Sequence, residues 1–176
     1  MRIIKWIGGI FIALILILSV GAMALPKEID MKRQISINAP AELVFSQVND
    51  LRAFSTWSPW ADDDPSLSNT FGPIEIGEGA SMSWTSDKMG SGVMTITSAS
   101  PHDHIDVNLD FGEMGDAKSY WNFSENSDVT EATWGMRTEI DEGFFSGWIA
   151  LFVKTATASA YEEGLEKLKS RVEAGS

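Results

Sequence analysis

Residues 146–174, SGWIALFVKTATASAYEEGLEKLKSRVEA, predict one long helix near the end of the chain. Ser146 is a residue type that often caps a helix N-terminus, and Gly175 is one that often follows a helix C-terminus. Apolar and small residues recur at three- and four-residue spacings, which predicts one face directed at a core. This predicted face comprises Trp148, Leu151, Phe152, Thr155, Ser159, Leu165, Leu168 and Val172.

The middle of the predicted helix, residues 155–160, is the run TATASA of six small side chains. Bulkier side chains precede and follow it. Such a helix either lets another element approach closely or leaves a space beside its middle. The space next to these residues therefore decides whether the domain encloses a cavity.

Composition restricts the possible functions. The chain has 176 residues and a formal net charge of −12, which argues against nucleic-acid binding because that requires a basic face. It contains no cysteine, so disulfides, thiolate zinc sites and thiol nucleophiles are excluded. An acidic surface mainly keeps a domain soluble.

The N-terminal region predicts a membrane segment. Residues 1–5 form a short tail, and residues 6–25 carry no charge, which corresponds to about 30 Å of helix, the thickness of a bilayer core. We expect a single-pass transmembrane signal anchor that exports the following domain to the periplasm or the cell exterior. A cleavable signal peptide ending at Ala22-Met23-Ala24 is the alternative. Residues 26–30 are expected to be a linker.

The next part of the chain predicts a strand at 31–37 and helices at 40–49 and 51–57, the second capped by Asp50 and ended before Pro59. Alternating apolar and polar residues then predict six further strands, so the sheet has one apolar face and about seven antiparallel strands. With the final helix this order is α+β, and the sheet should curl around that helix. The six later strands are expected at 66–71, 80–85, 92–100, 105–111, 118–123 and 132–138.

Several motifs in this order resemble the START-like, or SRPBCC, superfamily, in particular its polyketide cyclase/dehydrase-like branch. The opening Ile35-Ser36-Ile37-Asn38-Ala39-Pro40 and the later Trp57-Ser58-Pro59-Trp60 are the more specific ones. Further matching stretches are Val44-Phe45, residues 92–97 (GVMTIT), 133–136 (TWGM) and 164–169 (GLEKLK).

The resemblance covers residues 31–174 and implies a helix-grip fold. In this fold a curved antiparallel sheet wraps a long C-terminal helix, with an apolar cavity between them. Members bind lipids, sterols, polyketides, hormones or quinones, and only some catalyse reactions. The resemblance therefore does not by itself identify an enzyme.

The predicted binding site is the inner wall of this cavity. Taken singly, each wall residue is an ordinary core residue, but aromatic and methionine side chains facing a small-residue helix segment suit an adaptable apolar pocket. The expected ligand contacts are Trp57, Trp60, Met82, Trp84, Met94, Ile96, Leu109, Phe111, Trp121, Trp134, Met136, Trp148, Phe152, Thr155 and Ser159, with Trp57 and Trp60 near the mouth.

Two polar clusters are candidate metal sites. His102, His104 and Asp106 share one side of an extended segment, as metal ligands do, but Pro101 marks a hairpin turn, where His and Asp are common. Residues 62–64 are three consecutive Asp without the spacing of a calcium loop, so a solvated acidic loop is the preferred interpretation. We therefore predict no metal site.

Acid–base catalysis requires an ionisable group facing the cavity, and the apolar strand faces carry none. Only Ser83, Thr138, Thr155, Ser159 and Tyr161 offer hydroxyls there. We expect a membrane-anchored domain that binds a small hydrophobic molecule such as a lipid or quinone, without catalysis, catalytic residues or a cofactor. The alternatives are a cyclase or aromatase acting on a polyketide-like substrate, and a partner-binding module of the cell envelope.

Overall fold

The computed structural model describes the backbone of residues 2–140 and 143–175. It has the predicted α+β order, with five α-helices, one short 3₁₀ helix and seven strands in the described residues. The elements are α1 Arg2–Ala24, β1 Glu28–Ile37, α2 Ala41–Asn49, α3 Leu51–Trp57, α4 Trp60–Asp63, β2 Ser68–Phe71, β3 Ser81–Ser86, β4 Gly90–Ser100, β5 His104–Asp110, η1 Gly112–Met114, β6 Asp116–Asn126, β7 Val129–Glu139 and α5 Ser146–Ala174.

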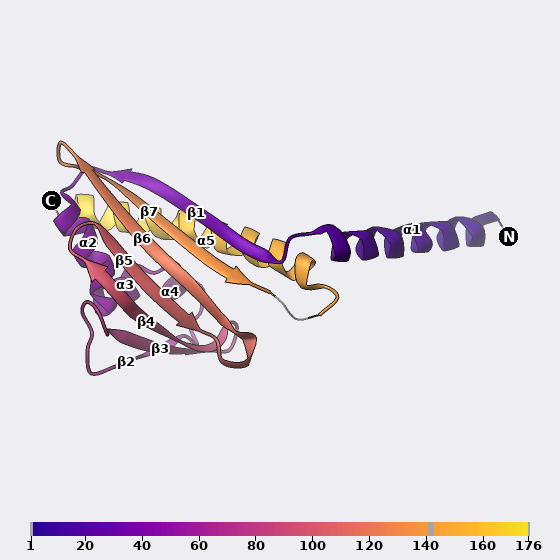
Figure 1. The fold of residues 1–176 in the computed structure, drawn as a ribbon, viewed down its shortest axis with the longest axis horizontal. Helices are drawn as coiled ribbons and strands as arrows, with labels where there is room; N and C mark the ends of the chain where they lie inside the picture. Colours follow the sequence, from indigo (N-terminus) through magenta and orange to yellow (C-terminus); the bar gives the residue numbers. More distant parts are fainter. Residues whose placement is uncertain (1, 141–142, 176) are drawn as a thin grey trace.

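The strands form one antiparallel sheet in the order β1-β7-β6-β5-β4-β3-β2. Strands β2 to β7 are a meander of consecutive neighbours, and β1 adds to the free side of β7. Helix α5 lies behind the sheet along β1 and β7, while α2 and α3 cover the same side nearer its C-terminus (Figure 1). The predicted arrangement of a curved sheet against a C-terminal helix is therefore confirmed.

Strand β1 begins earlier than expected, inside the predicted linker. Glu28 pairs with Glu139 and Ile29 with Thr138, so the strand has ten residues. Only the presence of β7 alongside makes residues 28–30 part of the sheet, because their local pattern is weak. The expected acidic loop likewise contains a short helix, α4, at its start.

The N-terminal helix α1 forms over the predicted segment and projects away from the sheet (Figure 1). Its C-terminal part contacts the start of α5, where the Trp148 indole N–H donates to the Leu18 carbonyl at 3.1 Å. Over the part of the chain that the structure describes, no helix is long and apolar enough to cross a membrane. The transmembrane interpretation of residues 6–25 is thus not supported by the structure.

Helix α5 has the predicted bounds, but its N-terminus differs in detail. Phe145 takes the capping position, and Ser146 is the first helical residue. The Ser146 hydroxyl is buried and has no hydrogen-bond partner among the described residues. At the other end, the Gly175 N–H donates to the Val172 carbonyl at 3.2 Å, as expected of a helix terminator.

The predicted apolar face of α5 is correct in its second half and wrong in its first. Leu151, Phe152, Thr155 and Ser159 are exposed. From Ser159 to Leu165 is a step of six residues, or about 1.7 turns, so these positions do not lie on one stripe. The buried stripe is instead Gly147, Ala150 and Ala158, followed by Tyr161, Leu165, Leu168 and Val172.

The buried stripe of α5 is therefore small in its first half and large in its second. Helix α5 contacts β1 more than any other strand. Within its small middle, Thr155 and Ser159 are exposed and face away from the interior.

Candidate functional site

The inner face of the sheet consists of side chains in register across the strands. One row runs from Met82 through Met94 and Leu109 to Ala117. A parallel row lies further along the strands and contains the two large indoles Trp121 and Trp134, which are direct cross-strand partners. The two rows differ in how completely they are covered.

Aromatic side chains fill the part of the interior beside the second half of α5. The Trp134 ring stacks on Tyr161 with centroids 3.7 Å apart and on Trp121 at 4.4 Å. Trp57 and Phe54 meet this stack edge-on. Trp57 is only 4% exposed, so it lies in the core and not at a mouth as predicted. We call this region the closed half.

The closed half contains a buried polar cluster. The Ser119 hydroxyl accepts from the Trp134 indole N–H at 3.0 Å, donates to the Gly135 carbonyl at 3.0 Å and lies 3.3 Å from the Tyr161 hydroxyl. Burial raises the pKa of the Tyr161 phenol. The phenol therefore keeps its proton at physiological pH and serves as a hydrogen-bonding group within the core.

Gly164 allows α5 to contact this aromatic layer closely. A Cβ at this position would lie 2.8 Å from the Trp134 ring and 3.0 Å from Pro59. A glycine is required here by this approach and not by its backbone conformation, since no positive φ is involved. The motif residues Pro59, Trp134 and Gly164 thus meet at a single point of the fold.

Coverage is incomplete at the end of the sheet where β3 and β5 finish. Trp84, Leu109 and Phe111 are only half-buried, although they belong to the inner face. The Trp84 indole lies flat over Gly92, where a Cβ would come within 2.3 Å of the ring, and it meets Phe111 edge-on at 5.6 Å. We call this apolar region the open half.

The first half of α5 lies toward the same end of the sheet, because Gly147 packs against Leu25 just before β1, and its less exposed side chains are small or half-buried. Ala150 is buried, and Val153 and Thr157 are partly buried. Trp60 lies at the boundary with the closed half, because its ring meets Trp134 at 5.8 Å and Tyr161 at 6.3 Å. The open half is therefore the accessible apolar wall formed by Trp84, Leu109 and Phe111.

The structure separates the predicted site residues into four groups. The first is buried and consists of Trp57 on α3 and, on the inner face of the sheet, Met82, Met94, Ile96, Trp121, Trp134 and Met136. The second is partly accessible and consists of Trp60 on α4 with Trp84, Leu109 and Phe111. Trp148 contacts α1. Its indole N–H donates to the Leu18 carbonyl, and its ring fills the space that a side chain on Gly21 would occupy. Phe152, Thr155 and Ser159 point away from the interior, because they fall outside the buried stripe of α5.

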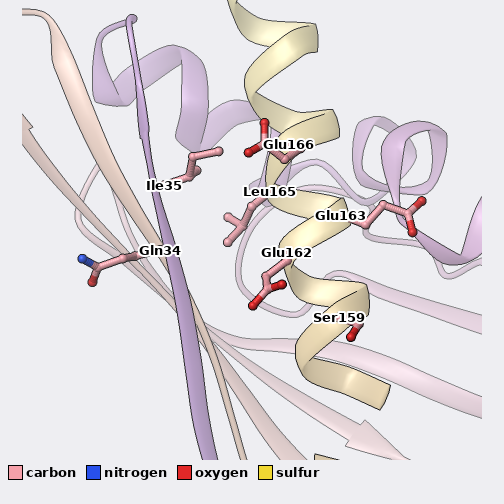
Figure 2. A pocket seen from close by; sticks show the side chains of 7 residues that line it. All are labelled: Gln34, Ile35, Ser159, Glu162, Glu163, Leu165 and Glu166. Atoms are coloured by element: carbon pink, nitrogen blue, oxygen red, sulfur yellow. The ribbon is translucent and has the colours of Figure 1, made fainter. Parts of the chain in front are cut away.

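A groove that sequence reasoning missed lies between β1 and α5 (Figure 2). It has a volume of about 550 Å³ and is open to solvent. Arg33 lies on the same, inner side of β1 as Met31 and Ile35, and its Nε donates a hydrogen bond to Glu162. Three carboxylates make the groove unsuitable for an apolar ligand. Its lining is Gln34, Ile35, Ser159, Glu162, Glu163, Leu165 and Glu166.

The histidine cluster is divided between two environments. His102 is in a turn with φ 62° and packs edge-on against Phe45. His104 instead hydrogen-bonds Asn122 at 2.7 Å and Asp106 at 2.9 Å. Among the described residues, no three His, Cys, Asp or Glu side chains are grouped as metal ligands would be.

Asp64 departs from the predicted solvated loop. It is buried and accepts hydrogen bonds from the backbone and hydroxyl of Ser66 and from the hydroxyl of Ser86. These bonds lower the pKa of Asp64 to about 2, and the hydrogen bond from the Ser66 hydroxyl contributes most. Asp64 therefore fastens the chain after α4 to the end of β3, next to the open half.

Comparison with known proteins agrees with this geometry. The family model described as polyketide cyclase/dehydrase and lipid transport matches residues 28–173, which confirms the resemblance to the START-like superfamily. A search of curated proteins found no match to the chain.

Solved structures share the fold at low sequence identity. The protein TTHA0849 from Thermus thermophilus is 18% identical with a TM-score of 0.66, and the match covers 84% of this chain and 99% of that one. CV1439 from Chromobacterium violaceum is 15% identical with a TM-score of 0.60, covering 82% and 98%. DynU16, from the dynemicin biosynthetic locus, is 17% identical with a TM-score of 0.57, covering 83% and 48%.

Proposed function

Because the chain belongs to the polyketide cyclase/dehydrase and lipid transport family, we propose that it binds a small hydrophobic molecule in the open half of its interior. The observation that carries this proposal is the incomplete cover of Trp84, Leu109 and Phe111. Large aromatic side chains on an inner face normally fill a core, as they do in the closed half. Apolar surface left accessible on the inner face of the sheet favours an apolar ligand.

The chemistry of the open half supports a lipid-like or quinone-like ligand. Its wall combines two aromatic rings with Leu109, and the cross-strand methionines Met82 and Met94 are flexible. The acyl chain or ring of a ligand would replace water on these groups. At roughly 25 cal/mol per Å² of buried apolar area, even a small contact supplies useful affinity.

We propose binding without catalysis. The phenol of Tyr161 stays protonated and is already in a hydrogen-bonded cluster with Ser119. The Arg33–Glu162 pair lies at the β1 edge and is mutually satisfied. A cyclase or aromatase would require a free acid or base directed at the ligand. These features support a carrier or sensor rather than an enzyme.

We further propose that α1 holds the domain at a lipid membrane, with the domain on the exported side. Residues 6–25 contain no charged residue, and the described side chains of α1 are mostly exposed. A helix whose described surface is mostly apolar favours contact with an apolar environment such as a lipid membrane. The large exposed side chains of α1 include Trp6, Phe11, Ile15 and Val20.

Native mass spectrometry of the full chain, released gently from lipid nanodiscs, tests ligand binding. We expect a bound hydrophobic molecule in the wild type and its loss in Leu109→Trp, which fills the open half. The matched control is Val93→Trp, on the same sheet region but on the opposite, exposed face. A ligand-free wild type, or equal occupancy in both variants, contradicts the proposal.

A further inference from the structure

The start of α5 carries an exposed apolar surface that the interior does not use. Residues 143–153 contain no charged residue in a chain of net charge −12. Within them, Phe152 is 73% exposed and Phe144 is 56% exposed, and Phe145, Ile149 and Leu151 are about as accessible as Phe144. We call these five side chains the aromatic cluster. Exposure of so many large apolar groups together is unusual for a soluble surface.

Helix α1 packs against α5 next to this cluster. The Trp148 indole donates to the Leu18 carbonyl, and its ring occupies the space that a side chain on Gly21 would need. A Cβ on Gly147 would lie 2.7 Å from the Leu25 side chain, so the residue that follows α1 also packs against the first turn of α5. The cluster and the apolar surface of α1 therefore belong to one end of the molecule.

The open half lies at this same end. The antiparallel register places the start of β1 beside the end of β7, and the end of β5 beside the start of β6. Trp84 and Phe111 stand near the ends of β3 and β5 in this group. The opposite end of the sheet carries α2, whose Gln47 accepts a hydrogen bond from Arg171 in the last turn of α5.

We propose that the aromatic cluster docks on the surface of the lipid bilayer that α1 contacts, so that the open half faces the membrane. Phenylalanine and isoleucine side chains enter the apolar edge of a bilayer, and tryptophan favours its interface. A hydrophobic ligand would then pass between bilayer and domain without crossing water. The ligand route rests on the proposed function, whereas the docking itself does not.

A lipid surface fits the cluster better than an acidic or basic protein partner. The cluster has no charge to match, and it is continuous with α1, whose exposed side chains are also apolar. The acidic net charge of the chain disfavours strongly anionic lipid, so zwitterionic lipid is the appropriate probe.

The absence of cysteine from the sequence makes a site-specific test simple. The variant Phe152→Cys, labelled with the environment-sensitive dye NBD and reconstituted as the full chain in phosphatidylcholine nanodiscs, should show a blue-shifted emission. Lipid carrying a nitroxide should quench it. The control is Ile76→Cys, which is also exposed but lies at the α2–α3 junction, where Gly77 bonds Asn49. Its emission should remain that of water.

An NBD emission at position 152 equal to that at position 76 overturns the docking proposal. The same label through Phe144→Cys repeats the test if the first variant fails to fold by circular dichroism. Mass spectrometry of the same nanodisc samples reports ligand occupancy separately. Membrane contact at position 152 without bound ligand would contradict only the proposed function, and bound ligand without contact would contradict only the docking.

Discussion

The two halves of α5 differ in the size of the side chains that they direct toward the interior. In the second half, Tyr161 and Leu165 point inward and meet a layer of stacked indoles that leaves them buried. In the first half, the inward residues are small, and the large residues Leu151 and Phe152 point outward. One helix thus supports a sealed core at one end and accessible apolar surface on two sides at the other.

This difference shows how a domain can combine stability with an apolar binding surface. A fully packed aromatic layer supplies favourable burial in one half, so the other half does not need to be sealed for the domain to fold. Functional surface is then available where packing is incomplete. Substitutions that act unequally on the two halves test this division.

The largest effect is expected for Trp134→Ala in the closed half. Removing an indole that stacks on two rings and donates to Ser119 should cost about 3–5 kcal/mol of unfolding free energy. The matched change Trp84→Ala in the open half should cost about 1–2 kcal/mol, because less surface is buried there. Denaturant unfolding measures both, and equal losses would contradict the division into halves.

Gly164→Ala should destabilise the protein by about 1–3 kcal/mol through overpacking against Trp134 and Pro59. On an unobstructed helix surface the same change would stabilise by about 0.5–1 kcal/mol, since alanine is the better helix former. Thermal unfolding distinguishes the two signs. An increase in melting temperature would show that the contact of α5 with the aromatic layer is looser than described.

The lowered pKa of Asp64 predicts that the stability of the folded protein depends on pH in acid. Its pKa is lowered to about 2 in the folded state, below the value of about 3.9 expected for an unfolded chain. The carboxylate therefore contributes stability above about pH 4, and this contribution is lost as the pH falls towards 2. Asp64→Asn should remove that part of the pH dependence, as measured by unfolding between pH 2 and 5. An unchanged profile would disagree with the Ser66 and Ser86 contacts.

The smallest effect on stability is expected for Phe152→Ser. An exposed side chain contributes little to folding, so the unfolding free energy should change by no more than about 0.5 kcal/mol. Membrane contact at this site should nevertheless weaken. A large loss of stability in denaturant would instead place Phe152 in a packed core.

Local patterns predicted much of the architecture. The Asp50 cap and Pro59 correctly bounded α3, since these signals act within a few residues. Alternation identified the inner face, and Arg137 lies on the opposite face from Met136, paired with Asp30. The same alternation in β1 would have placed Arg33 on the inner side, but its partner Glu162 lies far along the chain on α5.

Local patterns were less reliable where contacts between distant residues decide the outcome. The face of α5 was misassigned because a helix with apolar residues on several sides has more than one candidate stripe. Asp64 looked like a solvated loop residue, but Ser86, far away in sequence, buries it. The beginning of β1 could not be located without its pairing to β7.

By itself, the sequence determined the element order, the bounds of the C-terminal helix and the apolar face of the sheet, because these follow from capping, spacing and alternation within short segments. Only the tertiary structure decided which interior residues are packed and which remain accessible. Whether Trp134 fills a space and Trp84 leaves one open depends on the side chains that α4 and α5 bring against them. Such contacts join residues far apart in the chain, so no local pattern records them.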